Sequence, residues 1–278
     1  MKENEIGVFL SSMAISDPLE AIEKARELGL DVVQIGALPD EFYNNEGIER
    51  LRRCLQENGL RASAVCAVYT GEDYSDMAAV AETVGLTNPE MLQERMAHTK
   101  RCADLADSLG AGIVTTHIGV MSEDTDSSGY KNLLDTVREI ADYCGSRGLV
   151  FAMETGQETA EAMLQFIKDT GRNNVKVNFD PANMVLYGTG GPLEAVEVLR
   201  DHIAHVHVKD GLSPTQQGGL GTEVPLSQGE VNIREYIRKL ADIGYSGPLV
   251  IEREAGNDRT GDIARGRKLL EKILSELP

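Results

Sequence analysis

Strand-like and helix-like segments alternate along the whole of this chain. Short runs rich in β-branched and aromatic residues have the length of buried strands, and amphipathic segments of helical period separate them. The eight runs are Ile6–Leu10, Val32–Ile35, Ala62–Ala67, Ile113–His117, Val150–Glu154, Val175–Asp180, Ile203–Val208 and Leu249–Glu252. Regular alternation predicts a parallel sheet of an α/β protein, and eight units predict that the sheet closes into a (β/α)8 TIM barrel.

Local signals mark where the predicted helices begin and end. Gly29 and Gly59 each follow a helical pattern, and glycine suits the residue after a helix because it takes a positive φ without steric cost. The pairs Asp17-Pro18 and Asn88-Pro89 combine a capping side chain with a proline, which predicts a helix that begins at each proline.

The chain has 278 residues, a length that suits one large domain or two small ones. We expect a single domain over residues 1–278, because no linker or shift in composition divides the chain and α/β barrels reach this size. The main alternative is an open doubly wound sheet. That fold normally has a glycine-rich dinucleotide loop after the first strand, and residues 6–13 contain none.

Composition argues against several classes of partner. The net charge is −18, and so acidic a surface repels phosphate backbones, which makes nucleic acid an unexpected partner. No stretch approaches the ~18–20 apolar residues of a membrane span, and the polar N-terminus does not resemble a secretory signal. We therefore expect a cytoplasmic protein. Its four cysteines are far apart and are expected as buried, unpaired residues.

The last four strand-like runs each end at a residue that can bind a metal ion. These residues are Glu154, Asp180, His207 and Glu252. Any one of them could equally be a salt-bridged strand end, but the ends of parallel barrel strands converge on one pocket. Three carboxylates buried together repel one another unless a cation neutralises them. The pattern predicts one divalent metal ion, with Mn²⁺ favoured and Mg²⁺, Co²⁺ or Zn²⁺ as alternatives.

The segments around these four residues carry recognisable motifs. They are Phe151–Glu158, Asn178–Asn183, His205–Asp210, Val224–Val231 and Gly244–Glu254. These segments resemble the sugar phosphate isomerase/epimerase family of xylose-isomerase-like TIM barrels, which also include ketose 3-epimerases, inosose dehydratases and endonuclease IV. The resemblance covers essentially the whole chain. It implies the same four metal ligands, with Glu254 as the alternative ligand if the register of the last strand differs.

Two positions depart from the pattern of these relatives. Ketose epimerases and endonuclease IV have a histidine three residues after the aspartate, where this chain has Asn183. Asparagine can hydrogen-bond a sugar hydroxyl but is a poor ligand for a second metal ion. The third strand-like run ends near Cys66 without the histidine expected of a three-zinc nuclease. Together with the acidic charge, these departures argue against a DNA-repair enzyme.

The resemblance implies a metal-dependent isomerase or epimerase that acts on a sugar or polyol through an enediolate. Glu154 and Glu252 are expected to remove and return the proton on opposite faces, which gives epimerisation. The expected substrate contacts are His117, Glu158, Asn183 and Lys209. An inosose-dehydratase-like lyase and a non-catalytic carbohydrate-binding barrel are the alternatives.

Two long segments without regular pattern, Ala67–Asn88 and Lys209–Glu230, are expected to form lids or substrate walls. Both follow strands whose ends face the predicted metal site. The identity of the sugar, its phosphorylation and the formation of a homo-oligomer are left open by the sequence.

Overall fold

Eight parallel strands form a closed barrel in the computed structural model, which describes residues 4–216 and 218–277. The order around the barrel is β1-β10-β7-β6-β5-β4-β3-β2. The bounds are β1 Ile6–Phe9, β2 Val32–Gly36, β3 Arg61–Cys66, β4 Ile113–Thr116, β5 Val150–Glu154, β6 Val175–Phe179, β7 Ile203–Val208 and β10 Leu249–Ile251. The predicted single-domain (β/α)8 barrel is confirmed, whereas residues 1 and 278, its predicted bounds, lie outside the described residues.

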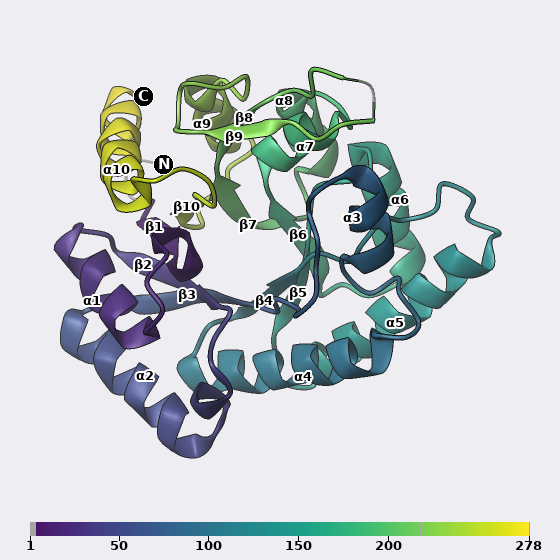
Figure 1. The fold of residues 1–278 in the computed structure, drawn as a ribbon, viewed down its shortest axis with the longest axis horizontal. Coiled ribbons are helices and arrows are strands. Elements are labelled where there is room, and N and C mark those ends of the chain that lie inside the picture. The colour runs from purple at the N-terminus through teal and green to yellow at the C-terminus, as the bar shows by residue number, and fades with distance from the viewer. Residues whose placement is uncertain (1–3, 217, 278) are drawn as a thin grey trace.

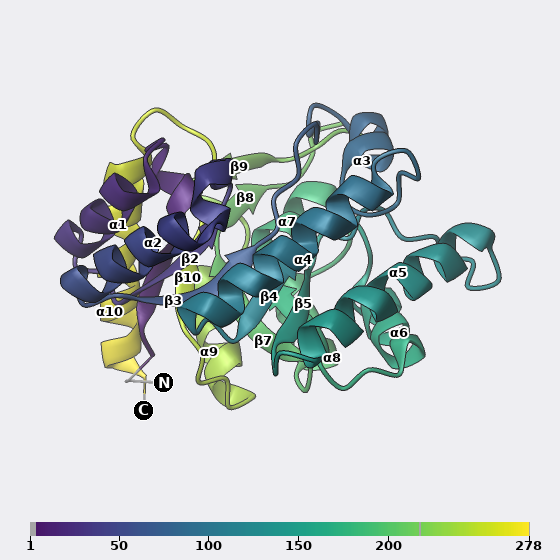
Figure 2. The same cartoon turned by 90° about the horizontal axis from the view of Figure 1, so that it is seen from below.

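Helices surround the strands on the outside of the barrel (Figures 1 and 2). Their bounds are α1 Pro18–Glu27, α2 Asn45–Asn58, α3 Met77–Thr83, α4 Leu92–Leu109, α5 Ser128–Gly145, α6 Ala160–Thr170, α7 Pro181–Tyr187, α8 Pro192–Leu199, α9 Ile233–Asp242 and α10 Arg259–Glu276. Short 3-10 helices cover Leu10–Met13 and Asp40–Tyr43. Figure 2 shows α1, α2, α4 and α5 following one another along one side of the barrel.

The first and last strands close the barrel. Ile6 of β1 lies opposite Leu249 of β10, while the other edge of β1 pairs with β2. Gly7 makes the second pairing possible, because a Cβ at this position would lie 2.5 Å from Cγ2 of Val32. The two ends of the described chain consequently lie close together, as both views show (Figures 1 and 2).

One predicted helix start is confirmed and the other is wrong. Asp17 caps α1, since its side chain accepts a hydrogen bond of 2.9 Å from the Leu19 amide. Asn88 instead forms a turn, in which its side chain accepts from the Glu90 amide. Helix α4 begins at Leu92, after this turn.

Several predicted strands are a residue longer than the observed ones. His117, Asp180 and Glu252 each follow directly after a strand. At Asp180 the reason is visible, because its side chain caps α7 and the backbone turns out of the sheet there. These residues still lie at the carboxyl end of the barrel, where active sites of this fold are found.

The two segments expected to be irregular contain short elements. Residues 67–88 include α3, and residues 209–230 include an antiparallel hairpin of β8 Asp210–Leu212 and β9 Thr222–Val224. The carboxylate of Asp210 accepts hydrogen bonds from the amides of Ser227 and Gly229. This side chain therefore fixes the path of the chain after the hairpin.

The core consists of apolar side chains from the strands and from the inner faces of the helices. Phe151 and Val177 of the barrel strands are fully buried. Each such side chain contributes about 1.5–3 kcal/mol by its removal from water. All four cysteines are free and buried, as the sequence predicted. Within residues 4–216 and 218–277, no helix has the length and apolar character that crossing a membrane requires.

Candidate metal centre

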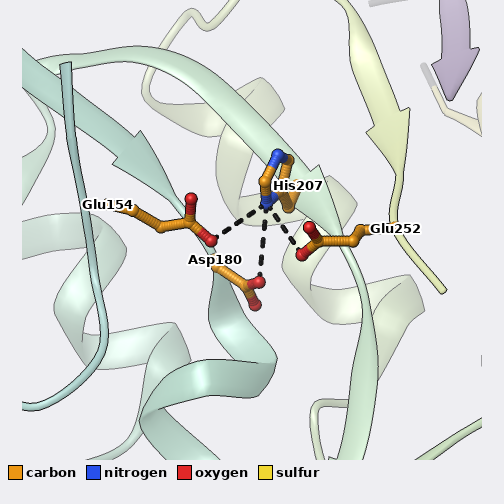
Figure 3. Close-up of side chains that lie close together, drawn as sticks. All are labelled: Glu154, Asp180, His207 and Glu252. Atoms are coloured by element: carbon orange, nitrogen blue, oxygen red, sulfur yellow. Dashed lines mark ion pairs between the residues drawn. The ribbon is translucent and has the colours of Figure 1, made fainter. Parts of the chain in front are cut away.

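Four side chains converge at the carboxyl end of the barrel. Ligand atoms of Glu154, Asp180, His207 and Glu252 all lie within 4.8 Å of one another, and each residue is at most 5% exposed. The Nδ1 atom of His207 is 3.3 Å from Glu154 Oε1, 3.5 Å from Asp180 Oδ2 and 3.1 Å from Glu252 Oε2. Figure 3 shows the three carboxylates around this nitrogen. The four residues expected to converge therefore lie together in the structure.

Four adjacent strands position this cluster. In the barrel, β5, β6, β7 and β10 are consecutive neighbours. Glu154 is the last residue of β5, and His207 lies opposite Val250 in the pairing of β7 with β10. Asp180 and Glu252 immediately follow β6 and β10. Parallel pairing brings the strand ends to one level, which is why residues nearly one hundred positions apart meet.

A glutamine inside the barrel orients the imidazole of His207. His207 Nε2 lies 2.6 Å from Gln34 Oε1, and Gln34 Nε2 donates to Thr115 Oγ1 at 2.9 Å. The second bond fixes the amide so that its oxygen faces His207 and accepts the Nε2 proton. Nδ1 is then the atom that faces the three carboxylates. Buried groups of this kind set the tautomer of metal-binding histidines.

Among the residues that the structure describes, two buried atoms of the cluster have no hydrogen-bond partner. They are Asp180 Oδ2 and His207 Nδ1. The other carboxylate oxygen of Asp180 accepts from the amides of Ala182 and Asn183, at 2.8 and 3.1 Å. Buried polar atoms are normally satisfied, and a bound cation would satisfy both of these. The donor set of three carboxylates and one imidazole therefore fits a divalent metal ion.

The electrostatics of the cluster keep its carboxyl groups ionised. Burial opposes ionisation of Glu154, Asp180 and Glu252, but the imidazole of His207 and other nearby cationic groups hold the pKa of each carboxyl below its ordinary value. Burial likewise opposes protonation of His207, yet Glu252 and Glu154 raise the pKa of its imidazole well above the usual range. Three negative charges thus persist in a buried space at neutral pH.

Lys209 lies beside the cluster and is almost fully buried. Its Nζ donates to Glu252 Oε2 at 3.0 Å and to Glu254 Oε2 at 2.6 Å, and it is 3.8 Å from Asp180 Oδ2. Glu254 thereby binds the ammonium and does not belong to the four-residue cluster. Glu252, rather than the alternative Glu254, faces His207.

The other three predicted substrate contacts occupy different places. Asn183 Nδ2 donates to Glu154 Oε1 at 3.2 Å, and His117 Nε2 lies 3.5 Å from the same oxygen. Glu158 is buried, and its carboxylate accepts from the Gly156 amide at 3.3 Å. Its other oxygen has no hydrogen-bond partner within residues 4–216 and 218–277, and burial raises the pKa of this carboxyl to about 7. His117 and Asn183 line the cavity described next, whereas Glu158 does not.

A cavity of about 550 Å³ opens above the cluster. Both segments expected as walls line this cavity. Residues 67–88 contribute Glu72, Tyr74 and Ser75, and residues 209–230 contribute Leu220 and Glu223. Its remaining lining residues are Phe9, Cys66, Ala67, Val68, His117, Glu154, Asn183, Leu186, Tyr187, Lys209, Gly221, Glu252, Glu254 and Ala255. The cavity is large enough for a small polar molecule.

Sequence reasoning assigned no role to three residues that shape this site. Gln34 holds His207, and Asn178 donates to Glu154 Oε2 at 3.1 Å while its oxygen pairs with His205 Nδ1 at 2.8 Å. Glu223 lines the cavity from the hairpin. For Gln34 and Asn178 a signal existed, because each is an uncharged polar residue flanked on both sides by apolar residues of a strand-like run.

Comparison with known proteins agrees with this geometry. The chain is 26% identical to the D-psicose 3-epimerase of Ruminiclostridium cellulolyticum over 83% of its length and 76% of that protein. It is 25% identical to a ketose 3-epimerase of Arthrobacter globiformis, over 88% and 80% of the two chains.

Solved structures show the same architecture. A xylose isomerase domain protein from Planctomyces limnophilus superposes with a TM-score of 0.86 at 33% identity, over 91% of this chain and 90% of that one. A protein from Mycobacterium smegmatis in complex with magnesium, described as a xylose isomerase-like TIM barrel, has the same fold, with a TM-score of 0.75, 22% identity and coverage of 98% and 97%. The family described as xylose isomerase-like TIM barrel matches residues 22–273. The chain therefore belongs to the xylose isomerase-like TIM barrel family.

Proposed function

We propose that this chain is a divalent-metal-dependent epimerase or isomerase of a neutral ketose or related polyol. The observation that carries the proposal is the buried cluster of three carboxylates and one imidazole beneath a cavity. Support comes also from the relatives of 25–26% identity that are ketose and D-psicose 3-epimerases.

The metal ion would be held by Glu154, Asp180, His207 and Glu252. When bound, it supplies positive charge that stabilises the oxyanion of a substrate that has lost a proton next to its carbonyl. The oxygen-rich donor set favours Mn²⁺, with Mg²⁺, Co²⁺ or Zn²⁺ also compatible.

The proposal assigns proton transfer to two glutamates. Glu154 and Glu252 approach His207 from strands on either side of β6 and β7 (Figure 3). One carboxylate removes a proton from the carbon next to the carbonyl, and the other returns a proton to the opposite face. Lys209, held by two carboxylates, and Asn183 are positioned to bind substrate hydroxyl or carbonyl oxygens.

The charge of the cavity indicates a neutral substrate. Five carboxylate residues line it, namely Glu72, Glu154, Glu223, Glu252 and Glu254. Among the described lining residues, Lys209 is the one lysine or arginine, and three carboxylates already surround its ammonium. A phosphate group would be repelled here, so phosphorylated sugars are expected to be poor substrates.

A dehydratase is the second candidate, and Lys209 favours it. The buried ammonium borders the cavity beside Glu252. After Glu252 or Glu154 removes the proton, a cation at this place can donate a hydrogen bond to a β-hydroxyl, which departs as water with that same proton. Loss of water from the same intermediate would then replace proton return.

Solvent-deuterium incorporation tests the function. Mn²⁺-loaded protein is incubated in D₂O with neutral ketoses, their phosphorylated forms and inososes, and products are followed by NMR and mass spectrometry. Incorporation next to the carbonyl together with an epimer or isomer supports the proposal. A product lighter by one water indicates the dehydratase, and absence of exchange with every compound contradicts both candidates.

The same assay tests the two glutamates. Glu154→Gln and Glu252→Gln should each lower the exchange rate by at least about a hundredfold, because neither amide can accept the proton. Glu90→Gln, at an exposed position that does not line the cavity, serves as the matched control and should retain full exchange. Near-normal exchange in either site variant would show that the two-base scheme is wrong.

A further inference from the structure

The hairpin of β8 and β9 brings the carboxylate of Glu223 to the chain segment that follows β10. Both oxygens of Glu223 accept from the amide of Glu254 at 3.0 Å, and Oε1 also accepts from the amide of Ala255 at 3.4 Å. The side chain of Glu223 is 7% exposed and borders the cavity. A single carboxylate thus binds the backbone within three residues of Glu252.

Arg253 connects this carboxylate to the rest of the barrel. Its guanidinium donates to Glu223 Oε1 at 2.5 Å and to Asp262 Oδ2 of α10 at 2.9 Å, and all three side chains are less than 10% exposed. The Arg253 amide also donates to Ser12 Oγ at 3.0 Å. Charge-assisted bonds shielded from water are strong and directional, so the segment after Glu252 is held from several sides.

Glu252 and Lys209 depend on the position of this segment. Glu252 and Glu254 both line the cavity, while Arg253 between them reaches Glu223 and Asp262. Lys209 Nζ bonds both Glu252 and Glu254. A shift of residues 252–255 would therefore move one carboxylate of the four-residue cluster and the ammonium together.

We propose that Glu223 is a positioning residue, which clamps residues 252–255 and thereby sets the place of Glu252 and Lys209. The hairpin that forms a wall of the cavity is in this way connected to the metal-binding carboxylate. The importance of that placement for turnover rests on the proposed function, whereas the clamp itself is a property of the protein without substrate.

Asp262 provides a matched comparison. It bonds the same guanidinium as Glu223 and is similarly buried, at 9% side-chain exposure. Its further partner is Arg265, and within the described residues no hydrogen bond joins its side chain to the backbone of residues 252–255. Glu223→Gln and Asp262→Asn each remove one negative partner of Arg253, but only the first weakens the backbone clamp.

Amide hydrogen exchange tests the clamp without any assumption about activity. In full-length metal-free protein, Glu223→Gln should accelerate exchange in peptides that cover residues 252–256 by about tenfold, because the amides of Glu254 and Ala255 lose acceptor strength. Asp262→Asn should leave these peptides near the wild-type rate. Unchanged exchange in Glu223→Gln, or equal acceleration in both variants, would overturn the proposal.

Metal affinity and kinetics test the consequence. Glu223→Gln should weaken Mn²⁺ binding by about tenfold in calorimetry and lower kcat more than it changes KM, while Asp262→Asn should do neither. Equal losses in the two variants would indicate general destabilisation and overturn a positioning role.

Two further measurements distinguish failure of the clamp from misfolding of the variant and from failure of the proposed function. If Glu223→Gln does not fold, Glu223→Asp retains the ion pair with Arg253 but recedes from the backbone by one methylene group, and it should reproduce the faster exchange. Wild-type exchange in Glu223→Asp would contradict the clamp. If wild-type protein binds no Mn²⁺ and turns over no sugar, the proposed function fails, and the exchange comparison still decides whether Glu223 clamps residues 252–255.

Discussion

Gln34 and Asn178 are polar side chains inside the barrel, and each orients a residue of the metal centre. Gln34 bonds His207, and Asn178 bonds Glu154. Neither residue belongs to the four-residue cluster, yet both limit the rotation of its members. Groups that hold metal ligands in place are often nearly as important for affinity as the ligands themselves.

Replacement of Gln34 should weaken metal binding. Gln34→Leu preserves much of the side-chain volume but removes the acceptor for His207 Nε2, which frees the imidazole to rotate and to change tautomer. We expect Mn²⁺ affinity to fall by about 10–100-fold in calorimetric titration. Gln56→Leu, at an exposed position of α2, is the control with the same substitution. Wild-type affinity in Gln34→Leu would contradict this role.

The stability of the fold should depend on pH through Glu158. Burial raises the pKa of this carboxyl to about 7 from 4.5, so between these values the folded chain holds a proton that the unfolded chain has lost. Stability contributed by that proton is present below pH 4.5 and is lost as pH rises through 7. The resulting cost at pH 8 is about 3 kcal/mol.

Glu158→Gln tests this expectation, because glutamine is neutral at every pH. Urea denaturation should find the variant more stable than wild type by about 3 kcal/mol at pH 8, with little difference at pH 4. The difference between the two proteins is the relevant quantity, because other groups titrate equally in both. A constant difference across this range would show that Glu158 ionises normally in the folded chain.

The four residues of the cluster could be predicted from the sequence, because each ends an apolar run. Three carboxylates buried together also repel one another unless a cation neutralises them. The hydrogen bond from His207 to Gln34 could not be predicted from the sequence. The pairing of β2 with β3 shifts register between Val33 and Gln34, and this irregularity helps to determine where the Gln34 side chain lies. Apolar alternation does not report such a shift.

At the scale of elements, the segment after β3 is fastened to the segment after β4. The Leu86 amide donates to the Ile118 carbonyl at 2.9 Å, and the Gly85 amide donates to Glu72 Oε1 at 2.9 Å. Glu72 in turn accepts from the hydroxyl of Tyr74 at 3.3 Å. The wall of the cavity therefore has a fixed position relative to His117, which precedes Ile118.

Gly85 allows this close approach, and alanine there should be costly. Its φ is +76°, and a Cβ would lie 2.0 Å from the Gly119 amide nitrogen. Gly59, with φ +63° and no atom within 4 Å of a Cβ, is the matched control. Urea denaturation should show a loss of about 1 kcal/mol for Gly59→Ala and about 3 kcal/mol or more for Gly85→Ala. Equal losses would mean that the contact with residues 118–119 is unimportant.

The short helix and strands inside the two cavity walls could not be predicted from the sequence. Helix α3 has seven residues and only Val80 of it is buried, so it shows no helical period. Strands β8 and β9 have three residues each, which is too short for alternation to be visible. The chain path after the hairpin depends on hydrogen bonds from distant amides to Asp210, and a local pattern contains no trace of them.

At the scale of the whole molecule, repetition made the fold predictable. Eight strand-like runs separated by helical patterns, without a glycine-rich loop after the first run, predict the closed barrel that is observed, even though several boundaries differ by a residue. The proposed metal ion would join four adjacent strands of this barrel. A ligand that binds the folded but not the unfolded chain raises global stability by mass action.

Metal addition and removal test this coupling. Mn²⁺ at about a hundred times its Kd should stabilise the protein by about 2.7 kcal/mol, which corresponds to a rise in Tm of roughly 5–10 °C for a chain of this size. Chelation followed by differential scanning calorimetry measures the reverse change. Asp180→Asn should abolish the shift, and an equal shift in that variant would place the stabilising ion elsewhere.

The four metal-centre residues lie between positions 154 and 252, whereas Cys66, Glu72 and Tyr74 on the opposite wall belong to the first third of the chain. Mutations can therefore change the wall after β3 and the four-residue cluster independently. Substitutions, insertions or exchange of the segment after β3 can alter which molecules fit the cavity while the four-residue cluster is transmitted unchanged. Under the proposed function, divergence of substrate preference then requires no loss of the four-residue cluster.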